Sequence, residues 1–214
     1  MIALIDYGAG NLTSVRKALT ALGADFTVPT STDACAQASG IIVPGVGHFA
    51  ATAALEGEWL QAIRSAVAAR VPLLGICLGM QWLFDGSDEA PEVEGLGVIP
   101  GRISRLQNDL EHRLKVPHVG WNALDFRADS ARLFRGLSSG AQVYFTHSYA
   151  APVTDECVAS TAHANTFSSV VERGNIFGVQ FHPEKSGDAG LQILRNFLTV
   201  CRPRSAKTPA GQAC

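Results

Sequence analysis

Residues 72–81 read PLLGICLGMQ, an apolar run that stops at Cys77 between two glycines. The run is continuous in apolar side chains, which is typical of a central parallel strand covered on both faces. The residues that follow, LGMQWLF, can form a helix. A strand that turns sharply into a helix needs small residues two positions before and after the turn, and Gly75 and Gly79 stand there. We therefore predict a strand, a tight turn at Cys77 and a helix.

The first half of the chain alternates between strand and helix patterns. Predicted strands lie at 2–6, 25–28, 40–45 and 71–76, and predicted helices at 11–22 and 58–70. Asn11 is the expected N-cap of the first helix, and Gly23 is expected to end it. This order predicts an α/β fold with an open, mostly parallel central sheet and helices on both faces.

The second half changes character after an acidic, glycine- and proline-bearing loop near residue 90. Short runs with turn signals predict antiparallel strands that extend or flank the first sheet. These runs are 101–106, 115–124, 141–149, 157–162, 168–174 and 175–181, and an amphipathic helix at 187–202 follows them. We expect one domain over residues 1–201 and a flexible polar tail at 202–214.

The composition of the chain argues against several classes of function. The 214 residues are 47% hydrophobic, and 17 basic against 19 acidic residues give a net charge of -2. This balance argues against nucleic acid or a membrane as the main partner. The start lacks the basic region of a secretory signal, and five scattered cysteines favour free thiols in the cytosol. The sequence has no pattern for a structural zinc site, and GAGN at 8–11 lacks the rest of a nucleotide fingerprint, so no metal or cofactor is expected.

Cys77 is expected at the carboxyl end of a parallel strand, where ligands bind in open α/β sheets. A helix that begins at Leu78 would turn its positive end toward the sulfur and favour the thiolate. The alternative is a buried structural cysteine whose glycine neighbours only form the turn. A thiolate nucleophile needs an imidazole oriented by a third group. His182 and Glu184 in GVQFHPEKS are two residues apart and project to one side of an extended segment, so they could supply both groups.

Acyl transfer also needs hydrogen-bond donors for the oxyanion. The N–H of Leu78, the residue after the nucleophile, is one candidate. A second could come from PGVGHF, where Gly45 and Gly47 permit peptide orientations that other residues resist. The alternative there is an ordinary turn.

The motifs PGVG, GICLGMQ and QFHPE together resemble those of class I, triad-type glutamine amidotransferases. DYGAGNL, PGVGHF, VPHVGWN, YFTHSY and QFHPEKS are similar, more specifically, to the glutaminase subunits of imidazole glycerol phosphate synthases, which act in histidine biosynthesis. The matching motifs run from Asp6 to Ser186. The resemblance implies that Cys77 attacks the amide of glutamine, His182 transfers the protons and Glu184 orients His182.

The resemblance also assigns binding roles. It implies an oxyanion hole from Leu78 and the peptide around Gly45 and Val46, in a loop that becomes aligned only when the partner holds its substrate. It implies a (β/α)8-barrel cyclase partner in a heterodimer, to which ammonia passes through a channel. Positions that match the glutamine site are Gly47, Gln81, Glu89, Ser148 and Tyr149. Positions that match the mouth of the site and the partner surface are Asn11, His118, Trp121, Tyr144 and Lys185; core packing is the alternative for Trp121 and Tyr144.

Three other functions stay open. A paralogous glutaminase could serve amidotransfer in a nucleotide-sugar or surface-polysaccharide pathway. A stand-alone thiol hydrolase, such as a γ-glutamyl peptidase, would turn over without a partner. A catalytically silent binding subunit of the same fold is disfavoured by an intact triad.

Overall fold

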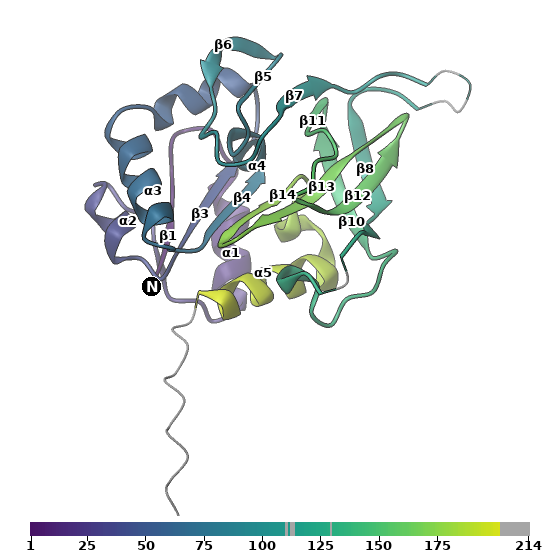
Figure 1. Cartoon of the computed structure of the whole chain (residues 1–214). Helices are drawn as coiled ribbons and strands as arrows, with labels where there is room; N and C mark the ends of the chain where they lie inside the picture. Colours follow the sequence, from purple (N-terminus) through teal and green to yellow (C-terminus); the bar gives the residue numbers. More distant parts are fainter. Residues whose placement is uncertain (110, 112–113, 129, 202–214) are drawn as a thin grey trace, which may run out of the picture.

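A computed structural model describes residues 1–109, 111, 114–128 and 130–201. The predicted tail at 202–214 lies outside the described residues. The rest of the chain is built around one large mixed sheet with helices packed on its two faces (Figure 1).

This sheet has eight strands in the order β2-β1-β3-β4-β14-β13-β12-β9. The first five pair in parallel, and β13, β12 and β9 are added antiparallel at one side. The predicted α/β class, with a mostly parallel sheet and an antiparallel extension, is therefore confirmed. The bounds are β1 Ile2–Leu4, β2 Phe26–Thr27, β3 Gly40–Gly45, β4 Leu73–Cys77, β9 Asp125–Phe126, β12 Cys157–His163, β13 Asn165–Arg173 and β14 Ile176–Val179.

The strand β14 differs from the prediction. The sequence placed it among antiparallel strands, but only its β13 side is antiparallel, and its other side pairs in parallel with β4. All four of its residues are buried, as expected for a strand inside a sheet that helices cover on both faces. This pairing brings the residues after β14, including His182, beside the carboxyl end of β4, where Cys77 lies.

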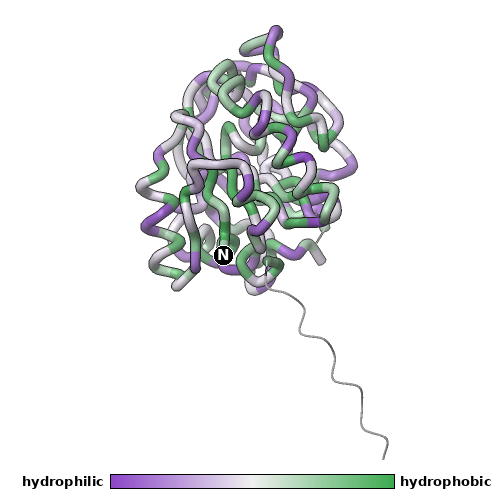
Figure 2. The backbone as a smooth tube through the Cα atoms, turned by 90° about the vertical axis from the view of Figure 1, so that its left-hand side faces the viewer, coloured by the Kyte–Doolittle hydropathy of each residue, from purple (hydrophilic) through white to green (hydrophobic). Residues whose placement is uncertain are grey.

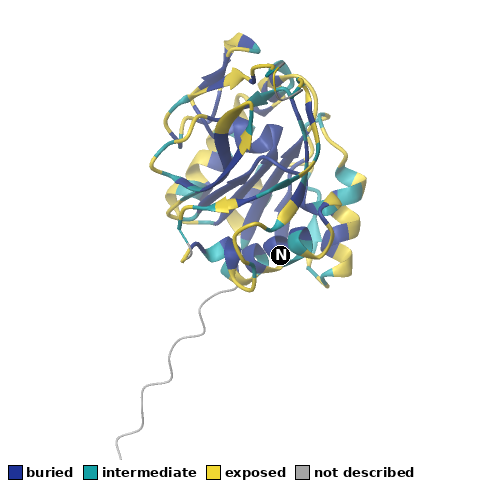
Figure 3. Cartoon of the chain, turned by 90° about the vertical axis from the view of Figure 1, so that its right-hand side faces the viewer, coloured by how far each residue is buried: buried dark blue, intermediate teal, exposed yellow. Residues whose placement is uncertain are grey.

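Successive residues of the central strands face opposite sides of the sheet, so they enter two different cores. Leu4 and Ile42 pack with α1 and α5, whereas Ala3 and Ile41 pack with α2 and α3. Buried and hydrophobic segments accordingly concentrate in the central strands, and the helices turn their exposed sides outward (Figures 2 and 3). The helix bounds are α1 Leu12–Ala21, α2 Asp33–Gln37, α3 Glu58–Ala68, α4 Leu78–Trp82 and α5 Gly187–Val200, with 3-10 turns η1 Phe49–Leu55, η2 Arg132–Phe134 and η3 Pro183–Lys185.

The ends of α1 follow the prediction. The Asn11 side chain accepts a hydrogen bond from the Ser14 N–H, as an N-cap does. The chain leaves the helix through Gly23, whose φ of 65° is one that glycine adopts without strain.

Two small sheets lie beside the large one. In one, β10 (Gln142–His147) pairs with β8 (His118–Ala123), and in the other the order is β11-β7-β5-β6. The predicted strand at 141–149 is therefore split at Ser148 between two sheets. The region near residue 90, expected as a loop, contains the antiparallel pair β5 and β6, and β5 pairs in parallel with β7. The remaining bounds are β5 Gly86–Ser87, β6 Ala90–Glu94, β7 Arg102–Arg105 and β11 Tyr149–Ala150.

Within the described part of the chain, no helix has the length and apolar character needed to cross a membrane.

Candidate active site

Cys77 is the last residue of β4 and the residue from which α4 starts. Its φ of 54° lies in the left-handed region, which a residue with a Cβ adopts only under constraint. The flanking glycines explain the constraint. A Cβ at Gly75 would collide with the backbone of Gly79, and a Cβ at Gly79 would collide with the Val43 carbonyl on β3. The predicted strand, turn and helix are confirmed, and the glycines are required by the close approach of α4 to the sheet.

His182 and Glu184 form a buried pair at the end of the neighbouring strand. Nδ1 of His182 and Oε1 of Glu184 are 2.9 Å apart, and both side chains are 2% exposed. Because the carboxylate can only accept, His182 carries a proton on Nδ1.

The other ring nitrogen, Nε2, is buried with no hydrogen-bond partner of regular geometry among the described residues. Burial lowers the pKa of His182, but interactions with Cys77 and Glu184 outweigh it and raise the pKa to about 9. The parallel pairing of β14 with β4 brings the segment of His182 beside Cys77, although His182 Nε2 and the Cys77 sulfur are not in regular hydrogen-bond geometry. An imidazolium beside a cysteine is the arrangement that favours nucleophilic attack by sulfur.

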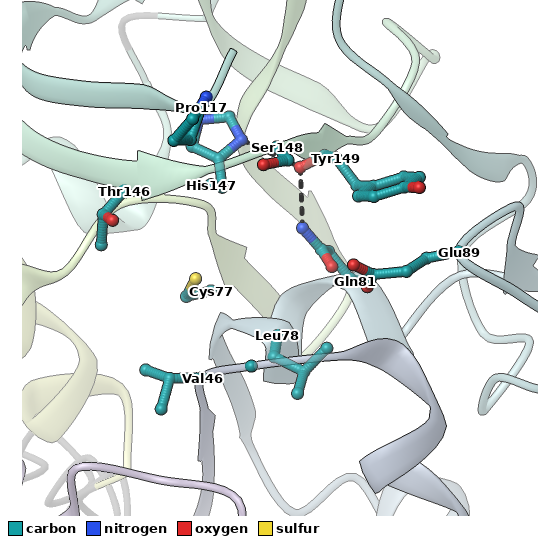
Figure 4. Close-up of a pocket in the computed structure, with 11 residues that line it drawn as sticks. Val46, Cys77, Leu78, Gln81, Glu89, Pro117, Thr146, His147, Ser148 and Tyr149 are labelled. Carbon is teal, nitrogen blue, oxygen red and sulfur yellow. Dashed lines mark hydrogen bonds between the residues drawn. The ribbon is translucent and has the colours of Figure 1, made fainter.

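A cavity of about 260 Å³ opens beside the Cys77 sulfur (Figure 4). Eight of the residues predicted for the nucleophile, the oxyanion hole and glutamine binding line it, and His182 and Glu184 are buried outside its lining. The lining residues are Val46, Gly47, Cys77, Leu78, Gln81, Glu89, Pro117, Thr146, His147, Ser148 and Tyr149.

Two polar side chains in this cavity are held by backbone groups. The Gln81 Nε2 donates to the carbonyl of Tyr149 at 2.8 Å (dashed in Figure 4), and Glu89 Oε2 accepts the N–H of Phe49 at 2.8 Å. Glu89 lies in the turn between β5 and β6, where acidic side chains are usually exposed to solvent. Its place in the cavity wall, tied to the start of η1, makes it a candidate for binding a cationic ligand group.

The two predicted oxyanion donors differ in orientation. Leu78 is the first residue of α4, so its N–H has no acceptor within that helix. The N–H of Val46 instead donates to the carbonyl of Ala9 at 2.9 Å. In this conformation the peptide between Gly45 and Val46 therefore does not offer its N–H to the cavity.

Gly45 itself is enclosed. A Cβ at this position would collide with the hydroxyl of Tyr7, which is buried with no hydrogen-bond partner among the described residues. Gly47 has a φ of 98°, which strongly favours glycine. The residues on either side of Val46 are therefore both glycines at positions where another residue would clash or be strained.

The five residues matched to the partner surface are not equivalent. Trp121 is 57% exposed and contacts Tyr144 edge-on across the β8–β10 pair, with ring centroids 6.1 Å apart. Core packing is therefore the wrong interpretation for Trp121. Asn11 and Lys185 are also exposed. His118 is 4% exposed, so it lies in the protein interior and not on the surface.

Several residues of the site were not singled out from the sequence. Val119, 57% exposed, adds to the apolar face of β8, and Pro117, Thr146 and His147 line the cavity. Gln180, fully buried, lies between Cys77 and Gln81. All five residues lie inside motifs quoted above, so the motifs were the signal that could have indicated them, although nothing in the sequence distinguished each residue from its neighbours.

Comparison with known proteins gives the family. The family model described as glutamine amidotransferase class-I matches residues 3–201. The chain is 48% identical over 205 residues to the imidazole glycerol phosphate synthase subunit HisH of Moorella thermoacetica, covering 94% of this chain and 95% of the relative. This chain belongs to the class-I glutamine amidotransferases, within them to the imidazole glycerol phosphate synthase subunits. The HisH subunit of Geobacillus kaustophilus is 47% identical over 210 residues, covering 95% of this chain and 99% of the relative.

Solved structures agree with the class-I amidotransferase fold. A crystal structure of a glutamine amidotransferase superposes with a TM-score of 0.70 at 20% identity and covers 94% of this chain and 98% of its own. The structure of PurLQS from Thermotoga maritima gives a TM-score of 0.66 at 17% identity, with coverage of 94% of this chain and 98% of its own.

No cluster of three or more side chains able to hold a metal ion is present in the described ranges.

Proposed function

We propose that this chain is the glutaminase subunit of an imidazole glycerol phosphate synthase and that Cys77, His182 and Glu184 catalyse its reaction. The pairing of β14 with β4 supports the catalytic roles, because it brings a buried His–Glu pair near a cysteine on a strained turn. The identity with HisH subunits supports the assignment to the synthase. The reaction converts glutamine and water into glutamate and ammonia.

The chemistry runs in two stages. The Cys77 sulfur attacks the side-chain carbonyl carbon of glutamine, and protonated His182 gives its Nε2 proton to the departing ammonia. A glutamyl thioester remains on Cys77. His182, now neutral, removes a proton from water, which attacks the thioester and releases glutamate and the thiolate. Glu184 keeps Nδ1 protonated and so directs Nε2 to the reacting atoms.

The cavity supplies acceptors for the ammonium group of glutamine. Nε2 of Gln81 is held by the Tyr149 carbonyl, which leaves Oε1 as the acceptor, and Glu89 contributes a carboxylate. We assign the peptide groups of Gly47, Ser148 and Tyr149 to the substrate carboxylate. These roles account for the mixture of acidic and backbone polar groups in a cavity sized for a small molecule.

Electrostatic stabilisation of the oxyanion is incomplete in this conformation. Leu78 provides one N–H, and Val46 provides a second only after its bond to Ala9 breaks and its peptide turns. We propose that this turn accompanies binding of the partner loaded with its own substrate. Glutamine would then be hydrolysed chiefly when its ammonia can be used.

We propose a (β/α)8-barrel cyclase as the partner, bound in a heterodimer over a surface that includes the half-buried Tyr144 and the exposed residues Asn11, Val119, Trp121 and Lys185. Ammonia released at Cys77 would pass to it through a channel, since free ammonia is protonated in water. The described cysteines are all free and buried, which suits a reducing compartment such as the cytoplasm. Residues 1–201 are the proposed amidotransferase domain.

The test is ammonia release from glutamine by the chain alone, with the cyclase subunit, and with the cyclase subunit plus its ribonucleotide. The proposal predicts low activity alone and a rise of about 10²–10³-fold in the full mixture, the effect of one added oxyanion donor. Full activity of the isolated chain would favour the alternative of a stand-alone thiol hydrolase, such as a γ-glutamyl peptidase. Stimulation only by a sugar-nucleotide amidotransferase partner would favour the paralogue, and no activity in any mixture would favour a silent binding subunit.

A further inference from the structure

Gln180 is a polar side chain in contact with the Cys77 sulfur that the proposed mechanism leaves unused. It follows the last residue of β14 and is completely buried. Its Nε2 donates to the Cys77 sulfur at 3.7 Å, and its Oε1 accepts from Gln81 Nε2 at 3.1 Å. One amide group therefore connects the sulfur to a side chain that binds substrate.

The orientation of this amide follows from its neighbours. The Tyr149 carbonyl can only accept, so the amide nitrogen of Gln81 must face it. That nitrogen also faces Gln180, so Gln180 must present its oxygen there and its nitrogen to the sulfur. The reverse orientation would set two NH₂ groups against each other and an oxygen against a thiolate.

The Tyr149 carbonyl is itself the end of a one-way hydrogen-bond series. Nδ1 of His147 donates to it at 2.9 Å, which leaves His147 Nε2 to accept from His118 Nδ1 at 3.1 Å. His118 Nε2 then faces the Asn122 amide nitrogen at 3.3 Å.

These histidines are neutral at physiological pH. Burial, reinforced by neighbouring histidines, lowers the pKa of His118 to about 3, and burial lowers that of His147 to about 4. Each ring therefore has one donor and one acceptor nitrogen, and only one direction satisfies the series. The amide orientations of Gln81 and Gln180 follow from the same Tyr149 carbonyl, which accepts from both His147 and Gln81.

We propose that Gln180 is a positioning residue that acts on both ends of the substrate. Its amide N–H holds the Cys77 sulfur and stabilises negative charge on it, while its oxygen fixes Gln81 so that the Gln81 carbonyl faces the ammonium of glutamine. A hydrogen bond to a charged acceptor is about twice as strong as a neutral one, so the contact favours the thiolate over the thiol. The inference rests on the proposed function through the role of Cys77 as nucleophile.

The test uses two substitutions and a matched control. Gln180→Leu removes both hydrogen bonds at similar volume, and Gln180→Glu keeps the shape but cannot donate to the sulfur when ionised. The control is Ser169→Ala, because Ser169 is also fully buried and touches Gln180 through its backbone, while its hydroxyl donates to the Ala159 carbonyl at 3.0 Å, away from the sulfur. Folding of each variant is checked by circular dichroism.

The decisive readout is the pH dependence of Cys77 alkylation by iodoacetamide in the full chain, followed on the Cys77 peptide by mass spectrometry. Gln180→Leu should move the midpoint of this profile upward by about one to two pH units. Gln180→Glu should move it further, because its carboxylate repels the thiolate. Ser169→Ala should lower the unfolding midpoint and leave the profile unchanged.

Steady-state kinetics of the complex with the cyclase subunit give the second readout. Loss of the hydrogen bond to sulfur should lower kcat by about tenfold to a hundredfold, and release of Gln81 should raise the KM for glutamine as well. A wild-type alkylation profile in either folded Gln180 variant would overturn the proposal, even if its activity fell. Full turnover by Cys77→Ser would instead overturn the proposed function, whatever the Gln180 variants do.

Discussion

Two segments at the same edge of the sheet differ in how ready they are for catalysis. The turn at the end of β4 holds Cys77 in a strained conformation beside a buried His182–Glu184 pair. The segment after the neighbouring strand β3 has the Val46 N–H bonded to Ala9 and not directed at the cavity. In the proposed mechanism, the nucleophile is therefore formed within this chain, whereas the oxyanion hole needs a rearrangement. We propose that a partner controls the reaction at the second segment.

The nucleophile side of this comparison is tested most severely by Cys77→Ala. Removal of the sulfur leaves no atom to form the thioester, so ammonia release should fall by about 10⁴–10⁶-fold in the activated complex. A urea unfolding curve recorded by circular dichroism should show that the Cys77→Ala variant is folded in the absence of urea. Residual turnover above about one hundredth of wild type would show that the reaction does not pass through this residue.

Glu184→Gln tests whether the His182–Glu184 pair sets the chemistry. The raised pKa of His182, about 9, means that the imidazole is protonated at neutral pH and loses its proton as the pH rises through 9. Since departure of ammonia needs that proton, kcat/KM should fall above about pH 9 in the wild type.

Replacing Glu184 removes a charge that raises this pKa, so the alkaline limb should move to lower pH, and the rate at neutral pH should fall by about 10²–10⁴-fold. A pH–rate profile measured from pH 6 to pH 10 provides the comparison. An unshifted alkaline limb in the variant would mean that Glu184 does not act on His182.

The oxyanion side is tested by Val46→Pro, with Val46→Ala as its control. Proline has no N–H, so the variant loses the second donor, whereas alanine keeps it. In the activated complex, Val46→Pro should lower the rate of ammonia release by about 10²–10³-fold, and Val46→Ala should stay close to wild type. Equal rates for the two variants would show that this peptide does not stabilise the oxyanion.

The smallest expected effect is on the partner surface. Trp121 is exposed in this chain, and large aromatic side chains often dominate binding energy. Trp121→Ala should weaken binding of the cyclase subunit by about 30-fold, measured by calorimetry, with little change in the unfolding midpoint. Unchanged affinity would place the partner elsewhere, and a large loss of stability would mean that Trp121 has a structural role.

Much of this site could be predicted from the sequence, because close packing leaves a local trace. The spacing of Gly75 and Gly79 around Cys77 reflects two backbone collisions that any Cβ would cause. His182 and Glu184 lie two residues apart, so their contact is also local. The parallel sheet could be predicted because the alternation of strands and helices in the first half is likewise visible in the local sequence pattern.

Other features depend on long-range pairing and left no such trace. The parallel pairing of β14 with β4 joins segments about a hundred residues apart, and its apolar sequence fits an antiparallel strand equally well. The same holds for Gln180 and His147, whose roles depend on which side chains the fold brings near them. The hydrogen bond between Val46 and Ala9 joins two backbone groups, so no side-chain pattern in the sequence could predict it.

The most direct test of the contrast measures two rates in separate aliquots of one preparation, with and without the cyclase subunit and its ribonucleotide. These are the alkylation of Cys77 by iodoacetamide and the release of ammonia from glutamine. If the nucleophile is already formed and only the oxyanion hole is incomplete, ammonia release should rise by about 10²–10³-fold while alkylation does not rise. A parallel rise of both rates would contradict this account, because the partner would then be creating the nucleophile itself.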